Sequence, residues 1–179
     1  TTGEGGAVVT RDPALATRMR KVKGQGQSFA RRYWHEELGF NYRMTNIEAA
    51  IGLAQLERLA DILAAKRRIA ARYRALLADA PVTFQRLDDG VVSSEWLVSC
   101  LLPRYCDRDR LMVDMAADGI ETRPVFYGAH QMPMYAHLAH DHLRTTEDIS
   151  ARGISLPSYP QLGDDDLARV VTALTRALD

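Results

Sequence analysis

The sequence predicts an α/β fold in which one long helix joins two regions of different pattern. Residues 45–79 keep apolar side chains at helical spacing over a length well above the mean for helices of globular proteins. After Pro81, short apolar runs typical of strands alternate with amphipathic helical stretches, which indicates an α+β arrangement. We therefore expect two domains, formed by residues 1–80 and 81–179.

Composition and charge exclude several classes of protein. Apolar residues make up 46% of the 179 residues, and Lys+Arg and Asp+Glu both number 23. Because the charges balance, we expect no strong electrostatic attraction of the chain to nucleic acid or to an anionic membrane. No apolar run is long enough to span a bilayer. We expect no signal peptide, and the two cysteines, Cys100 and Cys106, indicate a reducing compartment, so we expect a cytoplasmic protein.

The N-terminal region predicts a strand and a helix after an abrupt start. The chain begins at Thr1 with a glycine-rich turn and no methionine, so we expect it to be the C-terminal part of a longer protein. Residues 7–10 are β-prone. Asp12 followed by Pro13 is typical of a helix start, where the missing proline N–H costs nothing. We expect this helix to end at Gly24.

A capping box opens the long helix. Thr45 and Glu48 have the T-x-x-E spacing in which each side chain binds the other's free backbone N–H. Apolar residues then cover a wide arc in two stripes, which consist of Ile47, Ala50, Ile51 and Ala54, and of Leu53, Leu56 and Leu59. Such an arc predicts a helix buried in a core or at a subunit interface. We expect a bend near residues 59–65.

The C-terminal region predicts short strands and helices in alternation. We expect, in order, a buried strand at 95–102, a helix at 107–118 stopped by Gly119, an extended segment at 121–127, a helix at 146–153, a strand at 154–157 and a last helix from 164. The last helix is expected to bury one face, formed by Leu167, Val170, Val171, Leu174 and Leu178.

A polar loop before the long helix is the first candidate for a ligand site. Asn41 offers an amide, and Arg43 offers a guanidinium that can hold a phosphate or carboxylate with two parallel N–H bonds. A rigid helix behind the loop would aim both side chains. Spacing alone favours the ordinary alternative, a turn asparagine and a surface arginine.

Two cations and three aromatic rings follow one another at residues 31–35. Arg31 and Arg32 are suited to a diphosphate, while Tyr33, Trp34 and His35 offer rings on which a base can stack. The same residue types are enriched at protein interfaces, so an interface patch is the alternative.

The histidines of the C-terminal region differ in what they indicate. His137, His140 and His142 lack the spacing of a zinc signature, so we expect a solvated surface and no metal there. His130 follows an extended segment, and loops at strand ends often carry functional residues. The glycine-rich segments match neither a P-loop nor a dinucleotide-binding fingerprint.

Three stretches taken together resemble the pyridoxal-phosphate-dependent nucleotide-sugar aminotransferases of the DegT/StrS family. They are TTGEGGAVVT at residues 1–10, GFNYRMTNIEAAIGLAQLE at residues 39–57 and ETRPVFY…H…MPMY at residues 121–135. Their order and spacing agree with the family, and the resemblance covers essentially the whole chain. The stretches KGQGQ…RRYWH and TRPVFYGAHQMPMY are most similar to the GDP-perosamine synthases within that family.

The resemblance implies a fold and a reaction. The fold would be the C-terminal part of a fold type I aminotransferase, with the end of the large α/β domain, the long connecting helix and a small α+β domain. The reaction would pass the amino group of L-glutamate, through pyridoxal 5'-phosphate (PLP) and its pyridoxamine form (PMP), to the 4-keto carbon of a GDP-linked deoxysugar, a polysaccharide precursor. The enzyme would be a homodimer that shares the cofactor between subunits.

The resemblance also assigns residues. Asn41 matches the asparagine that reaches the cofactor phosphate of the partner subunit, and Arg43 belongs to the same shared site. The residues expected to contact the nucleotide sugar are Arg31, Arg32, Tyr33, Trp34, His35, Tyr127, His130 and Tyr135. The lysine that binds the cofactor covalently precedes Thr1 in the family, so we expect no catalytic residue on this chain and no activity from the fragment alone.

Two alternatives stay open. Some relatives carry histidine in place of that lysine and remove water from the sugar, which makes a PLP-dependent dehydratase of the same fold. A truncated chain would instead serve as an inactive dimerisation or regulatory module. The sequence before Thr1 decides among these readings.

Overall fold

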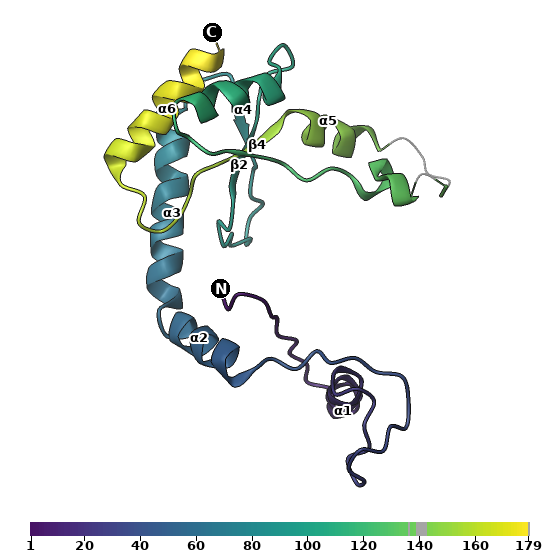
Figure 1. The fold of residues 1–179 in the computed structure, drawn as a ribbon. Coiled ribbons are helices and arrows are strands. Elements are labelled where there is room, and N and C mark those ends of the chain that lie inside the picture. The colour runs from purple at the N-terminus through teal and green to yellow at the C-terminus, as the bar shows by residue number, and fades with distance from the viewer. Residues whose placement is uncertain (136, 139–142, 179) are drawn as a thin grey trace. The chain divides into compact units, whose positions relative to one another are not determined.

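The chain, seen in a computed structural model, is described for residues 1–135, 137–138 and 143–178. Figure 1 shows its fold. The elements in chain order are α1 (Pro13–Lys23), α2 (Asn46–Glu57), α3 (Leu59–Leu76), β1 (Thr83–Phe84), β2 (Val98–Leu101), α4 (Arg108–Ala117), β3 (Arg123–Pro124), the 3₁₀ helices η1 (Ala129–Gln131) and η2 (Pro133–Tyr135), α5 (Arg144–Arg152), β4 (Gly153–Leu156) and α6 (Asp164–Leu178).

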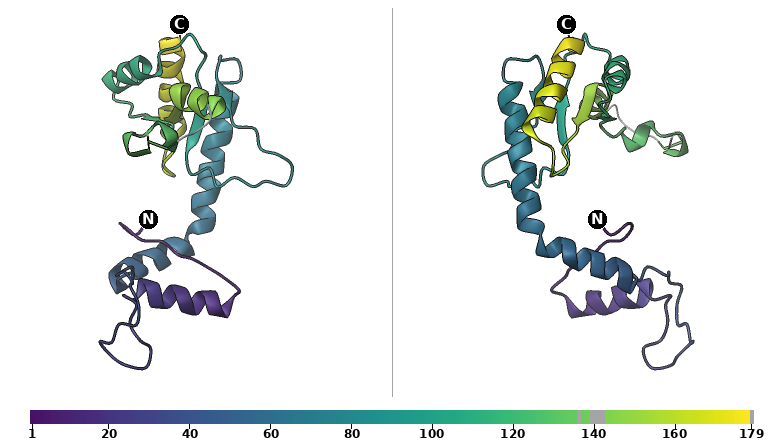
Figure 2. Two further views of the ribbon diagram at one scale, coloured as in Figure 1. Left: turned by 90° about the vertical axis from the view of Figure 1, so that its right-hand side faces the viewer. Right: turned by 60° about the vertical axis from the view of Figure 1, so that its left-hand side comes forward.

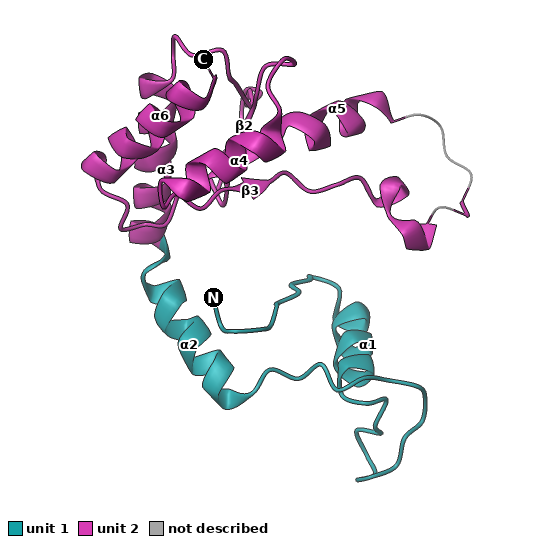
Figure 3. Ribbon diagram, turned by 45° about the horizontal axis from the view of Figure 1, so that its top comes forward, with its two compact units in different colours: residues 1–59 teal, residues 60–179 magenta. Residues whose placement is uncertain are grey.

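The chain divides into two compact units, unit 1 (Thr1–Leu59) and unit 2 (Ala60–Asp179), which Figure 3 distinguishes by colour. Helix α3 belongs to unit 2 because its Ile69, Ala70 and Tyr73 lie in the core of that unit. The expected boundary after residue 80 concerns the domains of a longer protein and stays a prediction.

The long helix expected at 45–79 is two helices, and this corrects the prediction. Helix α2 ends at Glu57 and α3 begins at Leu59. Between them, the backbone N–H of Arg58 caps the last carbonyls of α2 instead of continuing the helix. The interruption therefore lies just before the stretch in which a bend was expected.

Local capping signals start both helices of unit 1. Asp12 accepts hydrogen bonds from the backbone N–H groups of Ala14 at 2.8 Å and Leu15 at 3.2 Å, so α1 begins as predicted. The predicted capping box is also confirmed. The Glu48 N–H donates to Thr45 Oγ1 at 3.3 Å, and the Thr45 N–H donates to Glu48 Oε2 at 2.8 Å.

Unit 1 buries little apolar surface within this chain. Neither α1 nor α2 contains a buried residue, and Ile47 and Leu56 of α2 are 76% and 66% exposed. Burial of the apolar arc in the chain's own core is therefore wrong, and burial at an interface stays a prediction. Residues 7–10 also form no strand, because an extended run needs a partner strand and the sheet of the described residues contains only β1–β4.

Unit 2 is built on a four-stranded antiparallel sheet with the order β1-β2-β4-β3. Strands β2 and β4 pair along their whole length, from Val98 opposite Leu156 to Leu101 opposite Gly153. The short strand β1, which the sequence did not predict, and the short strand β3 form the two edges.

The core of unit 2 lies between the central strands and three helices. Its buried residues include Ile69 and Tyr73 of α3, Val98 and Cys100 of β2, Leu111 and Met115 of α4, Ile154 and Leu156 of β4, and Leu167, Val170, Leu174 and Leu178 of α6. The predicted buried face of the last helix is thus confirmed, except that Val171 is only partly buried. Figure 2 shows α6 beside α3, where Arg68 Nη2 donates to the Leu162 carbonyl at 2.9 Å.

The start of β2 differs from the prediction. The strand begins at Val98 rather than at residue 95, because Glu95 has a left-handed φ of +49° that no strand residue adopts. Trp96 is 69% exposed, so this part of the expected buried strand lies at the surface. The stop of α4 is confirmed by Gly119, whose φ is +75°. Among the described residues, no helix has the length and hydropathy that crossing a bilayer requires.

Candidate functional site

The polar loops of unit 1 form one structure, because residues on either side of the tip pair with each other. The Gln25 N–H donates to the Phe40 carbonyl at 2.9 Å, and the Phe40 N–H donates to the Val22 carbonyl at 2.8 Å. Closer to the tip, the Glu36 N–H donates to the Gly26 carbonyl at 2.9 Å. We call residues 24–43 the site loop.

Two glycines allow the two sides of the site loop to approach closely. Gly26 has a φ of +66°, and a Cβ there would lie 1.9 Å from the Glu37 carbonyl oxygen. A Cβ on Gly39 would lie 2.2 Å from the Gly26 nitrogen. Both distances are far below any real contact, so only glycine permits this geometry.

Ion pairs connect the site loop to α1. Arg18 pairs with Glu37, and Lys21 pairs with Glu36. The hydrogen bond from Lys21, followed by one from Ser28, lowers the pKa of the Glu36 carboxyl, so this carboxylate stays charged through the neutral range. The loop is therefore held on the last turns of α1 from one side.

The predicted cluster at the loop tip is exposed and partly paired with itself. The guanidinium carbon of Arg31 lies 4.3 Å from the centre of the Trp34 ring, and that of Arg32 lies 4.8 Å from the centre of the Tyr33 ring. His35 Nδ1 lies 2.9 Å from the Gln25 carbonyl, which can only accept, so Nδ1 carries a proton in this hydrogen bond.

Asn41 and Arg43 lie at the exposed end of the site loop. The backbone on both sides of Asn41 is fixed, because Phe40 and Tyr42 each donate an N–H to a carbonyl at the end of α1. The rings of Phe40 and Tyr42 also stack, with centroids 5.2 Å apart and planes 10° apart. Asn41 thus presents an exposed amide from a rigid backbone, close in sequence to the capped start of α2.

The predicted residues of unit 2 sit in a different environment. Tyr127 is half exposed, and its hydroxyl accepts a hydrogen bond from Arg108 Nη2 at 3.3 Å. Arg108 is only 4% exposed and also donates from Nη1 to the Ser150 carbonyl at 2.6 Å. The sequence did not single out Arg108, which connects α4, the end of α5 and the segment after β3.

His130 is nearly buried, unlike the cluster at residues 31–35. Its Nε2 lies 3.2 Å from Glu147 Oε1, and its side chain is 9% exposed. The Gly128 N–H donates to Gln131 Oε1 at 3.0 Å, which closes the turn that carries His130. Glu147 was not identified from the sequence, because the carboxylate lies on a separate helix, α5.

Tyr135 lies on η2 and is 45% exposed. His137 is exposed as well, whereas His140 and His142 lie outside the described residues. Within the described residues, no group of three His, Cys, Asp or Glu side chains is placed to hold a metal ion.

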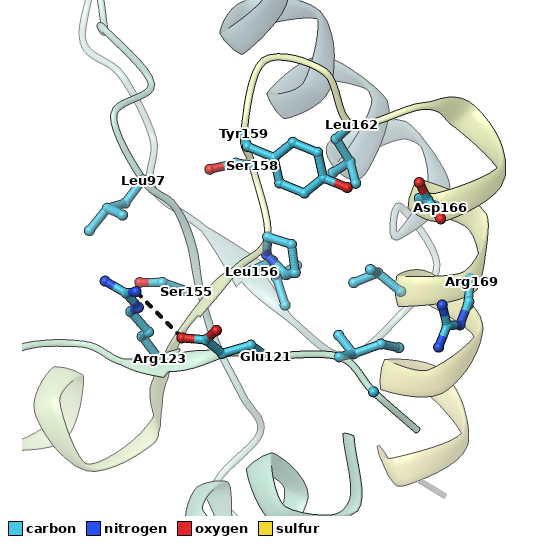
Figure 4. A pocket seen from close by; sticks show the side chains of 14 residues that line it. Leu97, Glu121, Arg123, Ser155, Leu156, Ser158, Tyr159, Leu162, Asp166 and Arg169 are labelled. Atoms are coloured by element: carbon cyan, nitrogen blue, oxygen red, sulfur yellow. Dashed lines mark hydrogen bonds and ion pairs between the residues drawn. The ribbon is translucent and has the colours of Figure 1, made fainter. Parts of the chain in front are cut away.

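A hollow of about 440 Å³ lies beside β4 in unit 2 (Figure 4). Its walls include Leu97 before β2, Arg123 of β3, and Ser155, Ser158 and Tyr159 in and after β4. None of the site residues predicted from the sequence lines it. The hollow escaped sequence reasoning because its walls come from segments that are far apart along the chain.

Comparison with known proteins agrees with the resemblance. A sequence profile of the DegT/DnrJ/EryC1/StrS aminotransferase family matches residues 1–175. The GDP-perosamine synthase of Caulobacter vibrioides is 43% identical over 189 residues, which cover 99% of this chain and 49% of that protein. The GDP-perosamine synthase of Escherichia coli O157:H7 is 44% identical over 174 residues, covering 97% of this chain and 47% of that protein.

Solved structures show the same relation. The crystal structure of DesI in the presence of its TDP-sugar product is 33% identical, with a TM-score of 0.89 over 99% of this chain and 46% of that one. The chain spans about half the length of the curated relatives it matches. The mixed helix and strand order described above is therefore the C-terminal part of a fold type I aminotransferase, as predicted. Because the family profile accounts for nearly every described residue, the chain belongs to the DegT/DnrJ/EryC1/StrS aminotransferase family.

Proposed function

We propose that this chain forms the C-terminal half of a PLP-dependent sugar aminotransferase, which transfers the amino group of L-glutamate to the 4-keto carbon of a GDP-linked deoxysugar. The observation that carries this proposal is the site loop, which presents Asn41 from a fixed backbone within the stretch that resembles the family most specifically. The two GDP-perosamine synthases above support the choice of a GDP-linked substrate.

The residues at the exposed end of the site loop suit a cofactor phosphate. Asn41 and Arg43 are both exposed, and their side chains offer N–H donors that match phosphate oxygens. The bound cofactor supplies the electron sink for amino transfer. This chain contributes the grip on the phosphate and thereby fixes the position of the cofactor in its site.

The cofactor is proposed to be shared across a homodimer. The apolar arc of α2 follows the site loop directly, and its most exposed members include Ile47 at 76% and Leu56 at 66%. Uncovered aliphatic surface of this kind is typical of an obligate interface. In the proposed dimer, Asn41 of one subunit reaches the cofactor that the partner subunit holds.

The lysine that binds the cofactor covalently is proposed to lie outside these residues. Lys21 is paired with Glu36. Lys66 Nζ donates to the carbonyls of Trp96 and Ser158 at 2.9 and 2.6 Å, so its amine is held by hydrogen bonds within unit 2. The third lysine, Lys23, lies in the last turn of α1 outside any stretch that matches the family's lysine.

The remaining residues are proposed to bind the nucleotide sugar. Arg31 and Arg32 carry guanidinium groups that suit a diphosphate, and the neighbouring Tyr33, Trp34 and His35 shape that binding surface. In unit 2, Tyr127 and His130 are held by Arg108 and Glu147, and together with the exposed Tyr135 they are proposed to face the sugar.

The test uses the complete enzyme with L-glutamate and a GDP-linked 4-keto deoxysugar. Formation of 2-oxoglutarate together with an amino sugar would support the proposal, whereas loss of water from the sugar without use of glutamate would indicate the dehydratase. We expect Asn41→Ala to weaken retention of PLP during dialysis by about ten- to 150-fold, since a charge-assisted hydrogen bond contributes about 1.5–3 kcal/mol. Asn46→Ala, at another exposed asparagine, is the control.

Subunit mixing tests whether Asn41 acts across the dimer. Asn41→Ala protein is mixed with protein whose cofactor lysine is replaced, so that each parent alone is inactive or impaired. If Asn41 acts in trans, half of the dimers are mixed and one of their two sites is intact, which restores about a quarter of wild-type activity. No restoration would show that Asn41 serves its own subunit.

A further inference from the structure

Two large aromatic rings lie together on the surface of unit 2 and are used by none of the roles above. Trp96 and Phe126 have ring centroids 6.5 Å apart and planes that differ by 20°. They are 69% and 74% exposed, although each carries a large apolar ring. We call them the ring pair. Nearly parallel exposed rings offer a flat surface for a planar ligand.

The segment before β2 holds Trp96 in a defined position. The preceding residue, Glu95, is only 8% exposed and has a left-handed φ of +49°, an unfavourable conformation for a residue with a side chain. Its carboxylate accepts from Arg74 at 3.3 Å, and its N–H donates to Ser93 Oγ at 3.0 Å. A partly buried ion pair therefore stabilises a turn that places the Trp96 ring at the surface.

A second anchor comes from α3. Lys66 Nζ donates to the Trp96 carbonyl at 2.9 Å and to the carbonyl and hydroxyl of Ser158 at 2.6 and 2.7 Å. One ammonium group thus joins the segment that carries Trp96 to the loop after β4. Because three acceptors share it, the Trp96 backbone is fixed independently of any ligand.

Phe126 is fixed from both sides. The Val125 N–H donates to the Gly153 carbonyl at 3.0 Å, and the hydroxyl of Tyr127 is held by Arg108. Phe126 therefore lies on an anchored segment rather than on a loose loop. A rigid pair of rings loses little conformational entropy when a ligand stacks on it.

The hollow of Figure 4 adjoins both ring-bearing segments. Leu97, next to Trp96, lines it, and so does Arg123, three residues before Phe126. Ser155, Ser158 and Tyr159 add hydroxyl groups to its walls. Its volume of about 440 Å³ falls in the range of small-molecule sites. Exposed rings close in sequence to the hollow, and hydroxyl groups within it, match the base and ribose of a nucleoside better than they match an aliphatic peptide. The Arg123 guanidinium in the hollow is paired with Glu121 at 3.4 Å.

The aromatic side chains of the site loop are less suited to a base. Arg31 lies over Trp34 and Arg32 lies over Tyr33, so one face of each ring is already covered by a guanidinium. Among the cation–ring contacts of the described residues, none involves Trp96 or Phe126.

We propose that the ring pair binds the nucleobase of the nucleotide-sugar substrate, with the adjoining hollow receiving the ribose side. This inference rests on the proposed function, which supplies the nucleotide. It assigns Trp96 and Phe126 the contact with the base.

The experiment measures the affinity of the complete enzyme for GDP and for inorganic pyrophosphate, which lacks a base. Trp96→Leu and Phe126→Leu keep apolar bulk but remove the ring. Stacking on a base contributes enough that we expect GDP to bind about five- to a hundredfold more weakly to each variant, with pyrophosphate unchanged. Trp96→Phe restores a ring and is expected to recover most of the affinity.

Trp34→Leu is the matched control, because it removes the other tryptophan of the chain. We expect it to affect GDP and pyrophosphate equally. Unchanged GDP affinity in Trp96→Leu, or an equal loss for both ligands, would overturn the assignment of the ring pair while leaving the proposed function intact. Failure of the wild-type enzyme to bind GDP would overturn the proposed substrate and this inference together.

Discussion

Replacing Gly26 with alanine tests whether the site loop works as a rigid unit. The new Cβ would lie 1.9 Å from the Glu37 carbonyl oxygen, whereas ordinary contacts begin at 3.4 Å. No rotamer change relieves this overlap, because the obstructing atom belongs to the backbone. The two sides of the loop must therefore move apart, and the 2.9 Å hydrogen bond from the Glu36 N–H to the Gly26 carbonyl is lost.

The cost has two parts. Alanine at the left-handed φ of +66° costs about 1–2 kcal/mol, and the lost backbone hydrogen bond costs about 1 kcal/mol more. Together they shift the loop by about 2–3 kcal/mol toward open conformations. If only the closed loop binds, apparent affinity falls with the closed fraction. We expect Gly26→Ala to raise the KM for the nucleotide sugar at least about tenfold.

Gly90→Ala separates the two parts. Gly90 has a similar φ of +82°, but a Cβ there meets no heavy atom within 4 Å. This variant suffers only the backbone strain and lies outside the site loop, so we expect its KM to stay within about twofold of wild type. Trypsin cleavage after the exposed Arg31 and Arg32 gives a second readout, which should accelerate only in Gly26→Ala. Wild-type KM and cleavage rate in Gly26→Ala would refute a rigid loop.

Two further predictions concern the core of unit 2. Burial raises the pKa of the Cys100 thiol to about 12 from 9.0. Between these two pH values the folded state keeps a proton that the unfolded state loses. The free energy of unfolding is therefore constant below pH 9 and decreases above it. Relative to Cys100→Ala, urea unfolding should show a loss of about 1.4 kcal/mol between pH 8 and pH 10, and identical pH dependence of both proteins would contradict this. Tyr73→Phe should lower the free energy of unfolding by about 1–3 kcal/mol, because the fully buried Tyr73 hydroxyl donates to the Pro157 carbonyl at 2.9 Å. The half-exposed Tyr159→Phe should change it by less than about 0.5 kcal/mol, and equal losses in the two variants would show that the buried hydrogen bond contributes nothing.

Local chemistry made much of the fold predictable. Asp12, Thr45 and Asp107 each start a helix by accepting hydrogen bonds from backbone groups two or three residues ahead. Gly119 ends α4 because it adopts a left-handed φ. Signals of this kind act within one turn of helix, so a short window of sequence contains all the information they need.

Features that depend on distant partners were predicted less well. The helical pattern at 45–79 continues through Arg58, yet the helix is interrupted there, and only α3 finds a core to pack against. The strand β1 forms because its residues pair with Cys100 and Leu101, and no pattern within residues 83–84 predicts that pairing. Burial also depends on distant partners, since Ile47 and Leu56 of the apolar arc of α2 stay 76% and 66% exposed among the described residues.

The aromatic groups of the two units differ in the same way, because one forms from residues close in sequence and the other from residues far apart. Arg31 and Trp34 lie three residues apart, so their pairing was visible in the sequence as a cluster of cations and rings. Trp96 and Phe126 are thirty residues apart, and they meet only because β4, from a third part of the chain, lies between β2 and β3. A contiguous cluster can be covered by its own cations, as Trp34 is by Arg31, whereas Trp96 and Phe126 stack on each other and take part in none of the cation–ring contacts of the described residues. The surface hardest to see in the sequence is therefore the one proposed above to bind the nucleobase.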